Sequence, residues 1–420
     1  MSKSIWYISK YFSAKTDNSA GGRDWFLTNE LSKQGYEITV ISSDSNTIFD
    51  VPVLKSSIEK DEREHITIYW LKTFKYKIPK SIRRVISWLH FEWLVFRLPK
   101  ESLPRPDAVI VSSLSLLSII NGYIFRRKFG CKLIFEVRDI WPLTIIEEGG
   151  FSANNPLVRF LAKLEKFAYK NSDIIVGTMP NLGEHVQNIL GFPKPTYCVP
   201  MGIDPEVLNL QKCVDDDFIN QYFSEDKFYV VYAGTIGITN ALDTFFSVAM
   251  QLIEHNDIHF IVLGDGALKL EYMNRYSNCK NISFMPKIPR LMVQSVLKHA
   301  DVLYLSTFNS KVWNYGQSLN KIIDYMLAAR PIIASYSGYP SMINESGSGY
   351  FVPAEDVFAV IDKIMLLKNM SPQERLEMGS KGREWILQNR NYSKLARFYA
   401  DIIFSTIQLI NRNSCYLIKH

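Results

Sequence analysis

Short apolar runs alternate with helix-like stretches along most of the chain. The runs lack polar interruptions, which is typical of strands buried on both faces of a parallel sheet. Between them, apolar residues recur at helical spacing. The expected strands are Ser4–Ser9, Glu37–Ser42, Pro106–Ser113, Gly130–Val137, Asp173–Thr178, Phe228–Gly234, His259–Leu263, Ile282–Pro286, Asp301–Ser306 and Ile332–Ala334. The expected helices are Asp24–Lys33, Asn155–Asn171, Asn181–Leu190, Ala241–Glu254 and Arg290–His299. This alternation predicts the α/β class.

The pattern falls into two series of strands and helices, separated near Met201–Asp204. A chain of 420 residues with 47% hydrophobic residues and a mean hydropathy of −0.04 is long enough for two globular domains. We therefore expect a Rossmann-like domain over residues 1–204 and a second one over 205–385. The helices of about 386–420 are expected to pack back on the first domain.

The stretch Ser306–Ala334 predicts a strand, a loop, a helix and a further strand, with Ser318 as the helix N-cap. The loop then lies at the carboxyl end of a sheet, where open α/β sheets bind ligands. The helix start and Lys321 offer positive charge to a phosphate, and Asp324 offers a carboxylate to a ribose. These features outline a nucleotide-diphosphate site. The alternative is that Lys321 and Asp324 are ordinary surface charges.

Glycine-containing loops follow three of the expected strands. They contain Gly21–Gly22, Gly234 with Gly237, and Gly264 with Gly266. Glycine lets a ligand approach the backbone closely, so each loop is a candidate for binding. For Gly21–Gly22 the competing interpretation is a flexible turn.

Arg138 and Asp139 follow a buried strand directly, and Trp141 and Pro142 come next. Charged residues held in this way at the end of a strand are candidates for an active site. The alternative is an Arg–Asp pair that only fixes a loop.

The segment Lys72–Lys100 carries eight Lys and Arg residues and one acid, Glu92, among large aromatic and aliphatic side chains. A basic, aromatic-rich helix of this kind can lie on an anionic membrane. The alternative is a helix packed on its own domain with solvated charges. The net charge of +6 adds a mild attraction to anionic surfaces.

Several other functional classes find no support in the sequence. No apolar stretch is long enough to span a bilayer, and Ile5–Ser9 is predicted to be a strand rather than part of a signal peptide. His255 and His259 are separated by a turn, which argues against a metal site. A P-loop, a G-x-S-x-G elbow and a full G-x-G-x-x-G are absent.

The motifs in their order along the chain carry a family resemblance. Gly21–Gly22, Arg138–Asp139, Gly202–Asp204, Gly234, Gly264–Gly266, Ser318–Met326 and Arg330–Ile333 together resemble the retaining glycosyltransferases of family 4. That family implies the GT-B fold, two doubly wound Rossmann-like domains that face each other across a cleft. The resemblance covers nearly the whole chain. It is closest to the bacterial branch that builds O-antigen, capsule or colanic-acid repeat units.

By this resemblance the first domain binds the acceptor and the second binds the nucleotide sugar. Asp324 matches the second acid of the family's E-x7-E motif, and Gly316 stands in place of the first. The loop after Gly234 lacks the family's Arg and Lys, so Thr235, Gly237 and Lys321 are expected to hold the diphosphate. The full expected donor set is Gly234, Thr235, Gly237, Gly264, Gly266, Ser318, Leu319, Asn320 and Asp324. The expected catalytic residues are Arg138, Asp139 and Lys321, and the acceptor-side residues are Gly21, Gly22 and Arg23.

The resemblance implies front-face transfer with retention, without a metal or another cofactor. The expected donor is a UDP-sugar carrying an N-acetylated hexosamine or deoxyhexosamine. The expected acceptor is a lipid-diphosphate-linked saccharide, reached by a peripheral enzyme on the cytoplasmic face of the bacterial plasma membrane, with no nucleic-acid partner. Two alternatives stay open: another GT-B sugar-nucleotide enzyme, such as an epimerase or a phosphorylase, and a non-catalytic nucleotide-sugar-binding scaffold.

Overall fold

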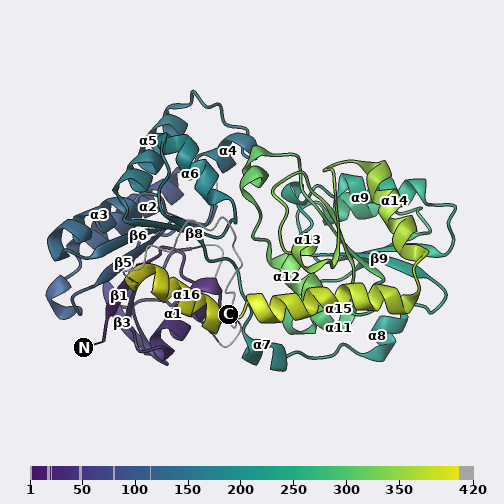
Figure 1. Cartoon of the computed structure of the whole chain (residues 1–420), viewed down its shortest axis with the longest axis horizontal. Helices are drawn as coiled ribbons and strands as arrows, with labels where there is room; N and C mark the ends of the chain where they lie inside the picture. Colours follow the sequence, from purple (N-terminus) through teal and green to yellow (C-terminus); the bar gives the residue numbers. More distant parts are fainter. Residues whose placement is uncertain are drawn as a thin grey trace. The chain divides into compact units, whose positions relative to one another are not determined.

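The computed structural model describes residues 2–16, 19, 21–46, 50–78, 81–113 and 115–405 (Figure 1). The chain divides into two compact units. Unit 1 comprises the residues up to Gly202 and the helix α16 (Tyr392–Phe404), and unit 2 comprises Ile203–Asn391. Residues 406–420, the end of the segment expected to pack on the first domain, lie outside the described residues.

Unit 1 is built on an eight-stranded sheet in the order β3-β4-β2-β1-β5-β6-β7-β8. Its strands are β1 (Ser4–Ile8), β2 (Glu37–Ser43), β3 (Ile58–Arg63), β4 (Ile66–Leu71), β5 (Ala108–Ser112), β6 (Lys132–Val137), β7 (Ile174–Gly177) and β8 (Thr196–Cys198). All neighbours are parallel except the hairpin of β3 and β4. From β1 the chain adds β2 on one side of the sheet and later adds β5 on the other side. This switch point between β1 and β5 is where ligands are expected to bind, at the carboxyl ends of the strands.

The helices of unit 1 connect these strands. They are α1 (Arg23–Lys33), α2 (Ile82–Arg97), α3 (Ser118–Phe129), α4 (Leu143–Glu147), α5 (Pro156–Asn171), α6 (Leu182–Leu190) and α16, with the 3-10 turn η1 (Lys100–Ser102). The start of α5 shows why a sequence can fix a helix boundary. Asn155 accepts a hydrogen bond from the Leu157 amide, and Pro156 supplies the first helical φ.

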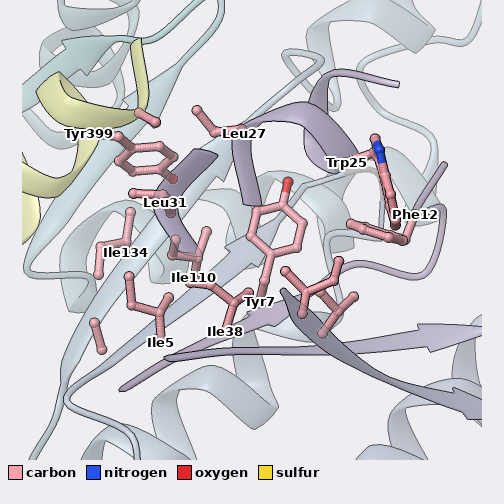
Figure 2. Packing of buried hydrophobic residues seen from close by; sticks show 14 of the residues in the cluster. Ile5, Tyr7, Phe12, Trp25, Leu27, Leu31, Ile38, Ile110, Ile134 and Tyr399 are labelled. Atoms are coloured by element: carbon pink, nitrogen blue, oxygen red, sulfur yellow. The ribbon is translucent and has the colours of Figure 1, made fainter. Parts of the chain in front are cut away.

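The core of unit 1 lies between the sheet and the helices α1 and α16. Figure 2 shows Tyr7, Ile38 and Ile110 from the strands beside Leu31 of α1 and Tyr399 of α16. Two ring pairs attach the end of the chain to this core: Phe26 stacks on Tyr392 at 5.1 Å, and Tyr36 stacks on Phe404 at 5.2 Å. The last described helix is therefore part of unit 1's core, although it follows unit 2 in the sequence.

Unit 2 contains a six-stranded parallel sheet in the order β11-β10-β9-β12-β13-β14. Its strands are β9 (Phe228–Ala233), β10 (Ile258–Leu263), β11 (Ile282–Met285), β12 (Val302–Ser306), β13 (Ile332–Ser335) and β14 (Gly349–Val352). This is the 3-2-1-4-5-6 order of the doubly wound fold, with its switch point between β9 and β12. A ligand site is expected at the carboxyl ends of these two strands.

The helices of unit 2 lie around this sheet (Figure 1). The α-helices are α7 (Pro205–Asn209), α8 (Asp216–Asn220), α9 (Asp243–Gln251), α10 (Lys269–Arg275), α11 (Val293–Leu297), α12 (Asn320–Leu327), α13 (Ile343–Ser346), α14 (Val357–Lys368) and α15 (Pro372–Asn389). The 3-10 turns are η2 (Ile238–Asn240), η3 (Arg290–Met292) and η4 (Lys311–Tyr315). In the part of the chain that the structure describes, no helix combines the length and the apolar character that crossing a bilayer requires.

Candidate functional site

A cavity of about 360 Å³ opens in unit 2 at the carboxyl ends of β9 and β10, beside the start of α12. Its walls come from five segments of the chain. They are Ala233–Thr235, Leu263–Asp265, Lys287–Ile288 with Arg290, Val293 with Leu297, and Asn320, Lys321, Asp324 and Tyr325. The cavity therefore lies at the switch point of the sheet, where the strand order places a ligand.

The backbones of the first two wall segments, Ala233–Thr235 and Leu263–Asp265, pack directly against each other. A Cβ atom on Gly264 would lie 1.9 Å from the carbonyl oxygen of Gly234, so no larger residue fits there. A Cβ on Gly234 would lie 2.9 Å from the Lys321 side chain. These two glycines let the loops after β9 and β10 converge and leave room for the lysine between them.

Helix α12 is fixed to the sheet by one tyrosine. The Tyr325 hydroxyl accepts a hydrogen bond from the Ala233 amide at 2.8 Å and donates to the Tyr304 carbonyl at 3.0 Å. The bonds therefore run to both strands at the switch point, β9 and β12. This contact sets the position of the helix start relative to the glycine loops.

Lys321, in the first turn of α12, extends into the site. Its Nζ atom donates to the Tyr232 hydroxyl at 2.9 Å and to Asn240 Oδ1 at 2.6 Å, and it lies 4.3 Å from the centre of the Tyr232 ring. Burial lowers the pKa of Lys321 to about 7. The amine therefore lies ready for an anion in the cavity, and no acid among the described residues pairs with it. The alternative of an ordinary surface charge does not fit this burial.

Asp324 faces the same cavity from the next turn of α12. Its carboxylate accepts two hydrogen bonds from the guanidinium of Arg290, at 2.6 Å and 2.8 Å. The Asp324 side chain is 15% exposed and that of Arg290 is 67% exposed. Burial raises the pKa of Asp324, and the charge of Arg290 opposes this rise. Asp324 is thus an inner carboxylate covered by an outer arginine.

The expectation for Ser318 is wrong. Helix α12 begins at Asn320 with Leu319 at the N-cap and no side-chain cap, and the buried Ser318 hydroxyl has no hydrogen-bond partner. The side chain of Gln317 instead accepts a hydrogen bond from the Leu319 amide at 3.0 Å. Gln317 thus satisfies the amide of the N-cap residue itself, whereas the sequence pattern predicted that Ser318 would cap the helix.

The structure gathers part of the expected donor set around the cavity. Gly234, Thr235, Gly264, Asn320, Lys321 and Asp324 line it. Gly237, Gly266, Ser318 and Leu319 are not among its lining residues. Sequence reasoning missed Lys287 and Arg290, which lie just after β11. Their place after a strand at the carboxyl edge was a usable signal for finding them.

The expected acceptor-side glycines of unit 1 serve its own packing. The Gly22 amide donates to the Ser13 carbonyl at 2.9 Å, and a Cβ on Gly22 would lie 2.8 Å from the Ser13 side chain. Gly21, with φ of 91°, lies against the Trp25 ring. Both glycines therefore close a loop of the chain on itself.

The expectation that Arg23 binds the acceptor is wrong. Arg23 is 1% exposed, and its guanidinium lies 3.0 Å from the buried carboxylate of Glu136. It also donates to the Val199 carbonyl at 2.7 Å, and Glu136 accepts from the Tyr7 hydroxyl at 2.7 Å and from Tyr399 at 3.2 Å. A residue so enclosed has no surface to offer to an acceptor. Arg23 instead connects α1, β6 and the segment after β8.

Arg138 and Asp139 lie at the carboxyl end of β6, as their order in the chain requires. The Arg138 amide donates to Ser113 Oγ at 2.9 Å, which joins the ends of β5 and β6. The side chain of Asp139 reaches solvent. Partial burial raises the pKa of Asp139, while the positive charges of Arg138 and Arg84 pull it down. This carboxylate therefore remains available to a ligand at the sheet edge.

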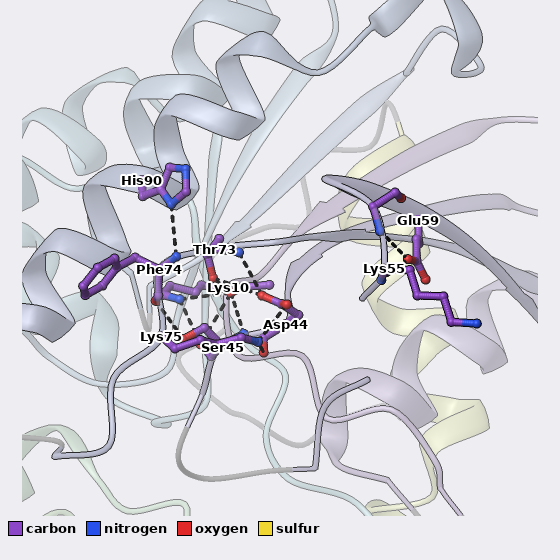
Figure 3. Close-up of polar contacts among 11 residues, drawn as sticks. Lys10, Asp44, Ser45, Lys55, Glu59, Thr73, Phe74, Lys75 and His90 are labelled. Atoms are coloured by element: carbon purple, nitrogen blue, oxygen red, sulfur yellow. Dashed lines mark hydrogen bonds and ion pairs between the residues drawn. The ribbon is translucent and has the colours of Figure 1, made fainter. Parts of the chain in front are cut away.

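A polar cluster joins the ends of β1, β2 and β4 (Figure 3). Lys10 Nζ donates to Ser43 Oγ at 3.1 Å and to the Ser45 carbonyl at 3.0 Å, and burial lowers the pKa of Lys10 to about 7. Asp44 accepts from the Thr73 amide at 2.8 Å and pairs with Lys75 at 2.7 Å. Because these groups form hydrogen bonds and an ion pair with one another, the cluster holds the loops that lead to α2 at the sheet edge.

Among the described residues, no group of three or more His, Cys, Asp or Glu side chains is placed to hold a metal ion.

Comparison with known proteins gives two family matches on this chain. Residues 25–207 match the model described as Glycosyltransferase Family 4, and residues 227–369 match the model described as Glycosyl transferases group 1. A probable glycosyltransferase, WbjE of Pseudomonas aeruginosa, is 22% identical over 304 residues, which is 70% of this chain and 74% of that protein. The two matched segments fall on unit 1 and unit 2 in turn.

Solved structures with the same fold cover nearly the whole chain. The E. coli trehalose-6-phosphate structure bound with UDP-2-fluoro glucose aligns over 98% of this chain and 100% of its own, with a TM-score of 0.71 and 13% identity. The sucrose-phosphate synthase of Thermosynechococcus elongatus aligns over 95% and 98%, with a TM-score of 0.69 and 16% identity. The Anabaena protein HepE, in complex with UDP and glucose, aligns over 96% and 99%, with a TM-score of 0.62 and 13% identity.

These likenesses confirm the two-domain α/β architecture of the GT-B type. With a Glycosyltransferase Family 4 match followed by a Glycosyl transferases group 1 match on a single GT-B chain, the protein is a glycosyltransferase.

Proposed function

We propose that this glycosyltransferase moves a sugar, with retention, from a UDP-sugar to a lipid-diphosphate-linked saccharide during the synthesis of a bacterial surface polysaccharide. The observation that carries the donor half is the cavity of unit 2, where a partly buried lysine and a helix start meet at the switch point of the sheet. The N-acetylated hexosamine or deoxyhexosamine as the donated sugar, and the O-antigen or capsule role, rest on the family resemblance.

The diphosphate of the donor fits the start of α12. The unpaired amides there and the amine of Lys321 oppose negative charge, and Thr235 adds an exposed hydroxyl. An anion bound beside Lys321 favours the charged amine, so the donor itself raises the pKa of this residue. The positive charge then stabilises the diphosphate as it departs.

The nucleoside of the donor binds to the inner carboxylate, that of Asp324. Asp324 accepts two hydrogen bonds from the vicinal hydroxyls of the ribose, in place of the two that Arg290 donates in the free protein. Arg290 is the exposed member of that pair, so it is the group that moves aside. The amides near Gln317–Asn320 replace the contact that the family's first acid would make at Gly316.

The transfer proceeds through an oxocarbenium-like state. The bond from the anomeric carbon to the phosphate oxygen breaks, the acceptor oxygen bonds to that carbon from the same face, and the acceptor proton passes to the departing phosphate. Asp139 and Arg138 of unit 1 are the residues assigned to the sugar in this step. No metal is required in this proposal, so full activity is expected in a chelator.

Helix α2 offers a surface for an anionic membrane. Its buried face carries Phe91 and Val95, and on the opposite face lies an exposed apolar stripe. The stripe consists of Ile82, Ile86, Leu89, Trp93 and Phe96, which are 44% to 80% exposed. The exposed basic residues Lys77, Arg83 and Arg97 flank it. A bilayer with anionic lipids matches both the apolar and the basic parts.

The expected helix was longer than the real one. Residues 72–78 form no helix, and α2 begins at Ile82. Two of the basic residues in this region serve the protein itself, because Lys75 pairs with Asp44 and Arg84 binds Tyr11. The membrane proposal therefore depends on the exposed stripe and its remaining cations.

A thermal-shift panel of UDP- and GDP-sugars tests the donor half, followed by transfer to a synthetic lipid-diphosphate saccharide. Stabilisation by UDP-sugars and a lipid-linked product are expected. A free sugar released by phosphate, or an epimerised nucleotide sugar, would replace the proposal by the corresponding GT-B activity. Binding without turnover would favour a scaffold, and transfer to a soluble sugar phosphate alone would remove the lipid acceptor.

Cosedimentation with phosphatidylglycerol-containing vesicles tests the membrane surface. The double variant Leu89→Ser with Trp93→Ser is expected to lose most of the bound fraction. The matched control is Leu157→Ser with Phe160→Ser, which changes two exposed apolar residues of α5 and leaves α2 intact. Equal sedimentation of the two variants would rule out α2 as the contact.

A further inference from the structure

Two tryptophan rings meet at the carboxyl edge of the sheet of unit 1. Trp88 of α2 and Trp141 after β6 form an edge-to-face pair, with ring centres 5.8 Å apart and planes inclined by 74°. Both side chains are only partly buried. In contrast, Tyr11, which packs beside α2, and Phe91, which belongs to α2, are 1% exposed or less. The tryptophan pair thus keeps apolar surface open that a purely structural contact would close.

A single phenol oxygen fixes the orientation of Trp88. The Tyr11 hydroxyl accepts hydrogen bonds from Trp88 Nε1 at 2.7 Å and from Arg84 Nε at 3.2 Å, and it lies 3.0 Å from the Tyr76 hydroxyl. Two accepted bonds and one donated bond satisfy this oxygen completely. The Arg84 guanidinium also lies over the Trp88 ring at 4.9 Å. The ring is therefore held in place before any ligand arrives, which lowers the entropy lost on binding.

A carboxylate lies close to this pair along the chain, in addition to the Arg84 guanidinium. Asp139 lies two residues before Trp141, and its side chain reaches solvent. Among the described residues, no side chain forms a hydrogen bond with that carboxylate. An aromatic face and an adjacent carboxylate suit a pyranose, because the ring contacts the C–H face of the sugar and the carboxylate accepts from its hydroxyls.

We propose that Trp88 and Trp141 form a stacking platform for a sugar ring of the acceptor, so that unit 1 recognises the acceptor by its carbohydrate. This inference rests on the proposed function and deepens it. Trp88 and Arg84 belong to the same helix that exposes the apolar stripe, so α2 carries both the lipid-facing surface and the sugar-facing one. An acceptor that joins a lipid to a sugar through a diphosphate requires that combination.

Isothermal titration with water-soluble decyl diphosphates tests the platform. The probes carry N-acetylglucosamine, N-acetylgalactosamine, glucose, galactose or no sugar. The wild type is expected to bind at least one sugar-bearing probe about tenfold more tightly than the sugarless one. Trp141→Leu is expected to reduce this preference to less than about threefold, and Trp141→Phe is expected to keep most of it.

The matched control is Phe160→Leu, which changes an exposed aromatic residue on α5 and should leave the preference unchanged. Equal binding of all five probes by the wild type would overturn the platform, as would an unchanged preference in Trp141→Leu. Folding is checked by thermal unfolding, and Trp141→Phe provides a second test if the leucine variant unfolds. If UDP-sugars do not stabilise the wild type against thermal unfolding, the proposed donor is wrong. That result is distinct from a failure of the tryptophan platform.

Discussion

At the scale of single residues, Lys321 links ligand binding to pH. Burial lowers its pKa from 10.5 to about 7, so above pH 7 the free protein carries a neutral amine there. A UDP-sugar needs the charged amine, because its phosphates are anionic. The unfolded chain binds the proton more tightly than the folded one between pH 7 and 10.5. This residue therefore lowers stability at pH 7 and below, and its penalty declines as the pH rises through that window.

The donor Kd is expected to weaken by up to about tenfold per pH unit above pH 7, with proton uptake on binding. Titration calorimetry between pH 6 and pH 8.5, in buffers of different ionisation enthalpy, measures both quantities. Lys321→Met should bind donor weakly at every pH and lose the proton uptake, while its thermal stability at pH 7 is unchanged or higher. The proposed role would be disproved by a pH dependence that survives in Lys321→Met.

Asp324 and Arg290 differ in burial, and this decides which of them matters for binding. The exposed arginine contributes at most about 1 kcal/mol through the pair, as surface ion pairs do. The carboxylate, in contrast, is only 15% exposed and is the group proposed to bind the ribose. Asp324→Asn is expected to abolish a preference of roughly tenfold or more for a UDP-sugar over its 2′-deoxy analogue.

The control for Asp324 is Arg290→Ala, which should change the donor Kd by less than about threefold and keep that preference. Competition binding with both nucleotides measures the effect. If Arg290→Ala loses the discrimination and Asp324→Asn keeps it, the arginine and not the carboxylate contacts the ribose.

These residues also show what a sequence can reveal about a site. Lys321 and Asp324 were predictable because both lie on a helix whose start is marked by a preceding strand and loop. The position of Arg290 after β11 was a usable signal, but its pairing with a carboxylate 34 positions later was not predictable, because no local pattern connects the two residues. Arg23 looked like a loop residue beside two glycines. Its buried partner, Glu136, comes from a distant strand, so the chain order gave no sign of the pair.

At the scale of elements, that buried pair joins α1 to β6. Glu136 is fully buried, and although burial alone would raise its pKa, the charge of Arg23 and its hydrogen bonds hold the pKa below the usual range. The pair therefore stabilises unit 1 above the ordinary titration range of a glutamate, and the contribution is lost as the pH falls through the lowered pKa.

Glu136→Gln is expected to cost about 3–5 kcal/mol, because it leaves the buried Arg23 charge without its counterion. Asp107→Asn provides the matched control, since Asp107 pairs with Lys3 across a solvent-exposed contact and should cost less than about 1 kcal/mol. Urea unfolding of both variants gives the comparison. Similar losses of unfolding free energy in Glu136→Gln and Asp107→Asn would mean that burial adds nothing to the strength of the Arg23–Glu136 pair.

The elements differ in how well their patterns predicted them. Most apolar strands of both sheets and the amphipathic helix α5 were predictable, because burial on a face imposes a period that can be read directly; β4, β8 and β14 were not among the expected strands. Strand β3 was missed, since its sequence from Ile58 to Arg63 alternates mostly charged residues at the sheet edge. The start of α12 was misplaced by one residue, because Leu319 and not Ser318 occupies the N-cap position, and its apolar side chain gives no capping signal.

At the scale of the whole molecule, the chain passes between its two units twice. The first crossing lies after Gly202 and the second after Asn391. Just inside unit 2 the two segments pair, with the Ile203 amide donating to the Arg390 carbonyl at 2.7 Å. The order of strands in each sheet could not be deduced from the sequence, because hydrophobic pattern reports burial and not the neighbour of a strand. The two-series pattern was enough to predict two Rossmann-like domains.

Because α16 completes the core of unit 1, a change at the far end of the sequence should act on the first half of the chain. Ala400 is 3% exposed in the cluster that contains Tyr7 and Leu31. Ala400→Asp places an unpaired charge there and is expected to cost at least about 3 kcal/mol, which lowers the melting temperature of unit 1 by roughly 10 °C. Arg397→Asp, at an exposed position of the same helix, should shift it by less than about 2 °C.

Differential scanning calorimetry with and without a UDP-sugar separates the two units in this experiment. The ligand should still stabilise the transition of unit 2 in Ala400→Asp, with an unchanged Kd at 20 °C, because the cavity and all its lining residues belong to unit 2. Sugar transfer should fall at temperatures where unit 1 has melted, since the residues proposed to bind the acceptor lie there. If Ala400→Asp weakens UDP-sugar binding as strongly as it lowers transfer, then the last helix supports unit 2, and the assignment of α16 to the core of unit 1 does not describe its role in solution.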